Sequence, residues 1–452
     1  MTSTTDAVTL HPPESRPAMV APATTTPLVE LFSPGVVAYR IAESEFALAD
    51  DLARFDHVRA VGAIEAAILY CTRIVEAMAR AALGPTNPDA NAELGGLLRE
   101  LFETRQIPSS LNRLLAQLRT LGNDARHANR SMSSVDADAA FIILVRWLHW
   151  SFCEAVYGPR LASIMVPNQP ADALLPRELA RLVDDSAATG EAVLASLTGP
   201  DPGASPALLT PVIPAAAAEA LLARDRWEAA HTILDLALRR FPRDLRLRQL
   251  IGLYWSRRGQ SEESVEHLHR ARKELEPLRL RGRASAADEE TFGILAGVYK
   301  RLAELDPTNA ADWLRQCQFT YREGWEQSRR TNGYLGINAA TMAVLLGQPM
   351  EVAEEIAGLI RDRLSNLQDR LRASSGVERP LTYWDQVTWA EAELLLSNWG
   401  HAGELYRDAF ARFATRTRDI AETVRQARRV LDRLSRRELA AGVLGRWADA
   451  AG

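Results

Sequence analysis

Two stretches of this chain repeat each other at a shift of 34 residues. Residues 218–230 read Ala-Glu-Ala-Leu-Leu-Ala-Arg-Asp-Arg-Trp-Glu-Ala-Ala, and residues 252–264 read Gly-Leu-Tyr-Trp-Ser-Arg-Arg-Gly-Gln-Ser-Glu-Glu-Ser. Small residues recur at matching positions, as where Ala218 meets Gly252. Because small residues let two helices approach closely, the pattern predicts helix pairs that stack on one another.

Each repeat unit is followed by a proline. Pro242 and Pro277 stand where a residue without a backbone N–H is expected to end the second helix of its pair. Small, aromatic, small and proline positions in this order are typical of tetratricopeptide helix pairs. Beyond these units the period weakens, but helical apolar spacing continues. We predict two tetratricopeptide-like helix pairs over 214–280 and a longer, irregular α-solenoid over 281–450.

The N-terminal half is expected to form a separate helical unit. Residues 1–27 are rich in Thr, Pro, Ala and Ser, which predicts a disordered leader. Residues 28–165 contain several helical segments between polar breaks, which predicts a helical bundle. The prolines of residues 166–213, which surround one short helical stretch, predict a linker. The predicted fold class is therefore all-α, an N-terminal bundle followed by a tetratricopeptide-like α-solenoid.

Composition restricts the compartment and the partners. The 452 residues carry a net charge of -5, which argues against broad attraction to nucleic acid or to an anionic membrane. The longest apolar run, residues 139–145, is about a third of the roughly 20 residues that a membrane-spanning helix needs. Three dispersed cysteines and the lack of a secretory signal favour a cytoplasmic protein. We expect neither a metal nor a cofactor.

Three apolar segments of helical spacing, residues 288–301, 334–347 and 383–395, carry polar residues where a packing helix would place Leu or Ala. One interpretation is that these polar groups bond to one another between helices, since buried polar groups need partners. The other is that they line a groove that binds a ligand. The candidate ligand-binding residues are Glu290, Lys300, Arg301, Tyr334, Asn338, Thr341, Trp384, Asp385, Thr388 and Glu391.

The mixture of residue types indicates what such a groove would bind. Lys300 and Arg301 are suited to phosphate groups. Asn338 is suited to the hydrogen-bonding edge of a base or a ribose, and Tyr334 or Trp384 to stacking on a ring. The groove hypothesis therefore predicts a nucleotide-derived small molecule or a polar protein segment as the ligand.

The same region resembles a known family. Gly293, Lys300-Arg301, Gly336-Ile-Asn338 and Tyr383-Trp-Asp385 follow one another as in the bacterial relatives of the TRAF-binding central region of ASK-type mitogen-activated protein kinase kinase kinases. The resemblance spans about residues 215–435. It implies a tetratricopeptide-like scaffold that assembles signalling complexes. In bacteria it implies a defence or conflict system that senses a nucleotide-derived signal.

The N-terminal unit carries a second resemblance, over about residues 40–158. Residues 63–76, 106–108 and 118–127 resemble a bacterial helical domain related to the HEPN superfamily. That resemblance implies an endoribonuclease with an Arg-Asn-x-x-x-His motif, whose Arg and His converge on the scissile phosphate across a dimer. Asn123 and His127 match the motif, but Gly122 stands in place of its arginine.

Arg119, Asn123 and His127 recur every four residues and are expected to form a stripe on one helix. The functional interpretation is contact with phosphate or RNA, with His127 as a general acid or base. The structural interpretation is that Asn123 caps or bends the helix at Gly122 and that His127 bonds to a neighbouring helix.

Our leading hypothesis is a non-catalytic signalling scaffold or sensor. Its solenoid binds a protein effector, a partner segment or a nucleotide-derived molecule, and its bundle forms a homodimer or docks an effector. The alternative is a metal-independent HEPN-type endoribonuclease that acts on RNA, with the solenoid as its regulatory arm and Arg119, Asn123 and His127 as catalytic candidates. A third possibility is an oligomeric scaffold without a ligand.

Overall fold

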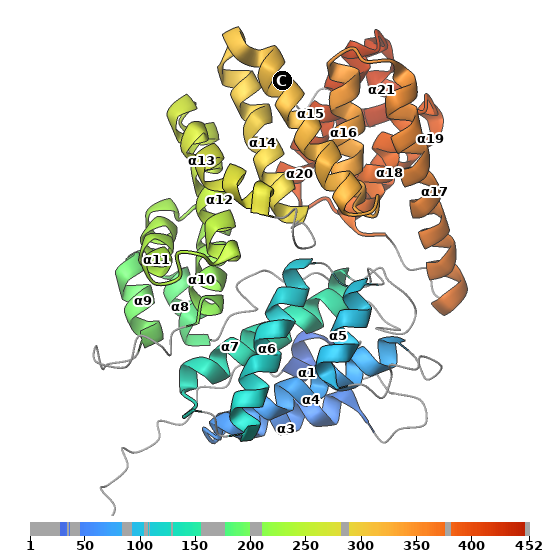
Figure 1. Ribbon diagram of the computed structural model, residues 1–452. Coiled ribbons are helices and arrows are strands. Elements are labelled where there is room, and N and C mark those ends of the chain that lie inside the picture. Colours follow the sequence, from blue (N-terminus) through green and yellow to red (C-terminus); the bar gives the residue numbers. More distant parts are fainter. Residues whose placement is uncertain are drawn as a thin grey trace, which may run out of the picture.

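The fold is all-α, as the sequence predicts (Figure 1). None of the described residues lies in a β-strand. The predicted leader over 1–27 lies outside the described residues. The computed structural model describes residues 28–33, 36, 46–83, 93–103, 107, 109–127, 130–154, 177–198, 210–281, 289–375 and 381–447.

An N-terminal bundle is built around helix α4, which packs against α3, α5, α6 and α7. Helix α4 is amphipathic, and its residues Cys71, Ile74 and Val75 are fully buried. Helix α7 begins with a capping box in which Ser133 and Asp136 bond to each other's backbone N–H. The bundle helices are α1 (Leu28–Leu31), α3 (Leu48–Ala60), α4 (Ile64–Leu83), α5 (Leu94–Glu103), α6 (Ser109–His127) and α7 (Ser134–His149), with a π-helical turn, η2 (Trp150–Glu154).

A solenoid of helix pairs follows, and Figure 1 shows it as an arc from green to red above the blue and cyan bundle. Most consecutive helices pack on each other. Its helices are α8 (Arg177–Asp184), α9 (Gly190–Thr198), α10 (Val212–Ala223), α11 (Trp227–Arg240), α12 (Leu245–Ser261), α13 (Val265–Arg281), α14 (Glu289–Leu305), α15 (Ala310–Gln327), α16 (Gly333–Leu345), α17 (Met350–Ser375), α18 (Tyr383–Leu395), α19 (Trp399–Arg412), α20 (Thr417–Arg433) and α21 (Ala440–Leu444).

The small residues of the repeat do bring helices close together. A Cβ on Gly252 of α12 would lie 2.6 Å from Cγ of Leu275 on α13, closer than real contacts allow. The expectation for Pro277 was wrong, however, because this proline lies inside α13, which continues to Arg281. Pro277 stands only four residues before the helix end, so it removes a single hydrogen bond of the last turn.

Part of the predicted linker is helical. Helices α8 and α9 lie within 166–213 and pack on α10 and α11, with Val183 and Val193 fully buried. One hydrophobic core runs from the bundle through these helices to Tyr254 of α12, and a second core begins at Leu268 of α13. The bundle and the start of the solenoid therefore share a core, and the domain boundaries drawn from the sequence remain predictions.

Gly336 provides a test of close helix packing. A Cβ at this position would lie 2.7 Å from Cε3 of Trp325, a ring only 2% exposed that has no room to move. We expect Gly336→Ala to destabilise the protein by about 1–3 kcal/mol. The matched control is Gly358→Ala, since no atom lies within 4 Å of a Cβ there and the change should stabilise α17 by about 0.5–1 kcal/mol. Urea denaturation measures both, and equal effects would contradict the packing argument.

Candidate functional site

Helices α12, α14, α16, α18 and α20 supply most of the lining of a cavity of about 990 Å³, called the groove below. The three polar segments predicted from the sequence meet there, although they lie on three different helices. Two of the ten candidates, Thr341 and Asp385, are outside the lining. The candidates that line the groove are Glu290, Lys300, Arg301, Tyr334, Asn338, Trp384, Thr388 and Glu391.

On α14, steps of three and four residues place Glu290, Gly293, Gly297 and Arg301 on one helical face toward the groove. The two glycines make room for larger side chains. A Cβ on Gly293 would lie 3.3 Å from Cε1 of Tyr334, and one on Gly297 would lie 3.0 Å from Nη1 of Arg301. The glycines of α14 therefore let a ring and a guanidinium lie against the helix backbone.

Four side chains from four helices form one hydrogen-bonded series beside the groove, called the polar chain below. Lys300 Nζ of α14 donates to Gln426 Oε1 of α20 at 2.9 Å, and Gln426 Nε2 donates to Glu391 Oε1 of α18 at 2.7 Å. The hydroxyl of Thr341 on α16 donates to the same carboxylate. The polar chain connects helices that lie up to 126 residues apart in the sequence.

Burial sets the electrostatics of the polar chain. It lowers the pKa of Lys300, and the positive charge of Arg429 lowers this pKa further. Burial also raises the pKa of Glu391, although hydrogen bonds from Thr341 and Gln426 oppose the shift. Lys300 is one of only two lysines in the sequence, the other being Lys273. One of these two lysines thus lies at a buried position, where a positive charge is costly.

Two aromatic rings face the groove with much of their surface free. Tyr334 and Trp384 are each 46% exposed. Tyr334 packs edge-on against Tyr321 with ring centroids 6.1 Å apart, and Trp384 against Tyr383 at 5.0 Å. Burial by the surrounding walls raises the pKa of the Tyr334 phenol, so it stays a neutral hydrogen-bonding group. Each ring is held by a buried neighbour and offers nearly half its surface to a ligand.

The two candidates outside the lining have structural partners. Thr341 is fully buried behind Glu391, to which it donates. Asp385 belongs to the N-terminal cap of α18, where the Thr382 hydroxyl donates to its carboxylate at 2.6 Å and its own N–H donates to Thr382 Oγ1 at 3.2 Å. Asn338 lines the groove and also donates to the Tyr334 carbonyl at 2.9 Å. Some of these polar residues thus form hydrogen bonds within one helix or to a neighbouring helix. Several of them also face the groove.

Sequence reasoning missed one wall of the groove. Helix α20 follows a regular amphipathic pattern, so nothing in its sequence separates a groove-facing polar side from a solvated one. An ion pair of Arg429 with Glu304 at 2.8 Å holds α20 against α14. Tyr321 was also missed, since an aromatic at helical spacing indicates packing. The missed lining residues include Ser256, Arg257, Gln260, Tyr321, Asp419, Glu422, Thr423, Arg425 and Gln426.

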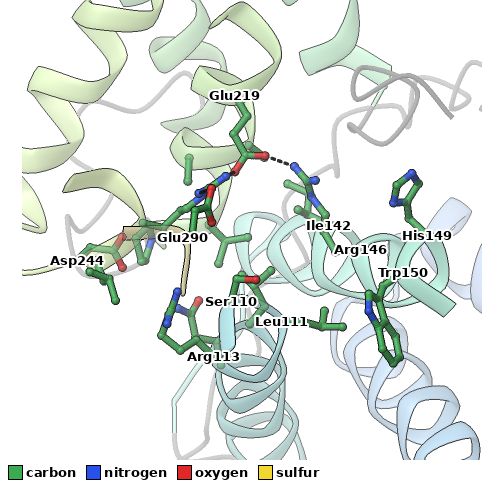
Figure 2. A pocket seen from close by; sticks show the side chains of 18 residues that line it. Ser110, Leu111, Arg113, Ile142, Arg146, His149, Trp150, Glu219, Asp244 and Glu290 are labelled. Atoms are coloured by element: carbon green, nitrogen blue, oxygen red, sulfur yellow. Dashed lines mark hydrogen bonds and ion pairs between the residues drawn. The ribbon is translucent and has the colours of Figure 1, made fainter. Parts of the chain in front are cut away.

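A second, smaller cavity of about 210 Å³ lies between the bundle helices α6 and α7 and the solenoid helices α10, α12 and α14. Figure 2 shows Glu219 of α10 reaching between the two units. It accepts hydrogen bonds from Arg146 of α7 and from Arg246 Nε of α12, the latter at 2.7 Å. Arg246 also pairs with Glu290 of α14. This set of four charged residues, the junction network, joins the bundle to the solenoid.

Opposite charges keep the junction network ionised. Burial acts to raise the pKa of Glu219, but Arg146 and Arg246 outweigh it and hold this pKa below its usual value. Burial likewise acts to lower the pKa of Arg246, and Glu219 and Glu290 reverse the shift. Glu290 lines both cavities. The junction network therefore includes a residue of the groove wall, Glu290.

The stripe predicted on α6 is divided in the structure. Arg119 and Asn123 line a third cavity, of about 380 Å³, whereas His127 is exposed at the helix end and does not line it. Helix α6 continues unbroken through Gly122, so Asn123 does not cap a helix end. Gly122 serves close packing, because a Cβ there would lie 2.4 Å from Cγ2 of Thr72 on α4. Arginine at this position would not fit.

A family model described as Tetratricopeptide Repeats-Sensor matches residues 222–343, just over a quarter of the chain. The match begins in α10 and ends in α16, and it includes the α14 side of the groove. No curated protein and no solved structure gives a significant match. The C-terminal half thus contains tetratricopeptide-like repeats. None of these comparisons matches the chain to ASK-type kinases or to the HEPN superfamily, and both resemblances remain predictions.

Two kinds of feature are not found within the described ranges. No helix there combines the length and the apolar character that a membrane crossing requires. No group of three or more His, Cys, Asp or Glu side chains is placed to hold a metal ion in the same part of the chain.

Glu219→Gln tests the junction network. The change leaves the guanidinium groups of Arg146 and Arg246 facing each other without the charge that separates them. Because Glu219 is only 18% exposed, we expect a loss of about 3 kcal/mol in unfolding free energy. The control is Glu228→Gln, whose 79% exposed carboxylate pairs with Arg258 and should contribute below about 1 kcal/mol. A similar small loss for both variants would show that the network is not a structural centre.

Lys300→Met tests whether the groove lysine costs stability. A lysine whose folded pKa is lowered destabilises the fold below its ordinary pKa of 10.5, and this cost disappears as the pH rises past that value. We expect the variant to be more stable than the parent by about 1 kcal/mol at pH 7, with a smaller difference at pH 10. Lys273→Met, at an exposed site on α13, is the control. A destabilised Lys300→Met protein would contradict this account.

Proposed function

We propose that the protein is a non-catalytic sensor or scaffold whose groove binds a nucleotide-like ligand, one that carries a flat ring and an anionic group. The observation that carries this proposal is the meeting of exposed aromatic rings and cations in a single cavity of about 990 Å³. That volume lies at the upper end of the roughly 300–1,000 Å³ usual for small-molecule sites. The groove is therefore large enough for a complete nucleotide derivative.

The two groove cations retain charge for an anion. Among the described residues, Lys300 bonds only to the amide of Gln426, and Arg301 only to Gln260 at 2.9 Å and to Ser256 at 3.2 Å. These partners are neutral, so no carboxylate neutralises either cation by direct contact. A phosphate that replaces an amide oxygen brings a full negative charge to each cation, which adds Coulomb attraction to the hydrogen bond.

The rings and the polar side chains supply the other half of the recognition. Trp384 and Tyr334 offer surface on which a base can stack, and each base stacked on an aromatic contributes roughly 1–3 kcal/mol. Thr388 and Asn338 lie in the same lining, and their polar groups match the edge of a base or a ribose hydroxyl. A groove with rings, polar side chains and cations discriminates between a nucleotide and an inorganic anion.

The sensor family model supports a binding role for the repeats. The bundle and the solenoid are joined by the junction network, which reaches the groove wall at Glu290. We infer that an occupied groove is reported through this connection to a protein partner. The endoribonuclease alternative gains no support, because His127 lies apart from the cavity that Arg119 and Asn123 line.

Reductive methylation with ¹³C-formaldehyde offers a direct assay, since the chain has only two lysines and one terminal amine to label. We expect NAD-derived or cyclic nucleotides to shift the Lys300 signal and leave Lys273 unchanged. Trp384→Ala and Arg301→Gln should each weaken the binding of such a ligand about tenfold, through lost stacking and a lost charge-assisted bond. The control is Phe319→Ala, a ring 50% exposed but outside the groove. Undiminished affinity in Trp384→Ala would refute the groove assignment.

A further inference from the structure

Arginines in this protein are usually paired, and a cluster in the bundle is an exception. On α4, Arg73 pairs with Asp51 at 2.7 Å and Arg80 with Glu76 at 2.8 Å. By contrast, Arg99 of α5 and Arg119 and Arg126 of α6 form no hydrogen bond or ion pair with any described residue. All three side chains are exposed to solvent, so their lack of a partner among the described residues leaves three positive charges available to a solute.

The three arginines line the same cavity of about 380 Å³, between α4, α5 and α6. Steps of four and three residues along α6 bring Asn123 and Arg126 to the face that carries Arg119. Arg119 is fitted against α5, because a Cβ on Gly95 would lie only 2.4 Å from its Nη1. The lack of a side chain at Gly95 thus leaves room for this guanidinium beside α5.

The charges of the lining favour an anion. Two carboxylates, Glu76 and Glu93, share the cavity with the arginines, but Glu76 already accepts a hydrogen bond from Arg80. Like charges that line one cavity repel each other, and an anion between them removes this repulsion. Guanidinium groups match phosphate oxygens with two parallel N–H donors each, and the Asn123 amide adds a further donor.

The lining also indicates the size of the ligand. Sites for single-stranded nucleic acid combine a long basic groove with aromatic rings that stack on successive bases. None of the described residues that line this cavity is aromatic, and the others among them are Thr72, Leu94, Gly95, Gly96 and Gly122. The chemistry therefore fits one compact phosphate group or diphosphate better than an extended strand.

We propose that this cavity of the bundle is a binding site for a compact phosphate-bearing molecule, with Arg99, Arg119 and Arg126 as its cationic contacts and Asn123 as a hydrogen-bond donor. The site binds and does not catalyse, since His127 is outside it. It is separate from the groove and does not depend on the function proposed for the groove.

Calorimetric titration of the full chain with pyrophosphate tests the proposal. The Lys300→Met/Arg301→Gln background removes both cations proposed to bind an anion in the groove, so binding that persists there is assigned to the bundle. We expect Arg119→Gln and Arg126→Gln each to weaken this binding about tenfold, as loss of a charge-assisted hydrogen bond does. Gly95→Ala changes no charge but displaces the Arg119 guanidinium, so it should weaken binding as well while the melting temperature stays the same or rises.

Two controls separate the site from general charge effects. Arg239→Gln removes an exposed, paired arginine of α11, and His127→Gln alters the neighbouring helix end, so both should leave the affinity unchanged. The proposal is overturned if pyrophosphate does not bind, or binds equally to Arg119→Gln and Gly95→Ala. It is also overturned if a single-stranded RNA oligomer binds through Arg119 far more tightly than pyrophosphate, because the site would then serve a nucleic acid.

Discussion

The polar chain from Lys300 through Gln426 to Glu391 and Thr341 is the constraint on which the groove depends. A buried carboxylate is costly unless it accepts hydrogen bonds, and Glu391 can obtain them only if α16, α18 and α20 lie together around it. Lys300 then fixes α20 against α14 as well. These bonds hold the helices of the solenoid together around the groove. The exposed rings of the groove are held in place by the helices that carry them and need no ligand to position them.

Much of this arrangement could be predicted from local sequence. Helical apolar spacing located most of the helices, and polar residues within apolar segments identified most of the side chains that line the groove on α14, α16 and α18. The α20 wall could not be found in this way, because an amphipathic helix has the same pattern whether its polar side faces solvent or a cavity. The predicted linker contained α8 and α9, which are short and gain their stability by packing on α10 and α11.

The two sites proposed to bind anions differ in character. In the groove, cations bond to neutral amides and hydroxyls beside aromatic rings, which suits a ligand with a base. In the bundle, guanidinium groups converge without aromatic residues, which suits phosphate alone. Between them lies the junction network, where every cation is matched by a carboxylate and no charge is left for a ligand.

The division between the two hydrophobic cores has a consequence for how the chain folds. The first core ends on α12 and the second begins on α13, so the division between the cores falls inside a helix pair. The bundle and helices α8 to α12 share the first core, and the rest of the solenoid contains the second. A fragment that begins at residue 214 would expose the apolar side of α10 that packs on α7, and it would be prone to aggregate. The first helix pairs of the solenoid thus bury their apolar surface partly against the bundle and not only against one another.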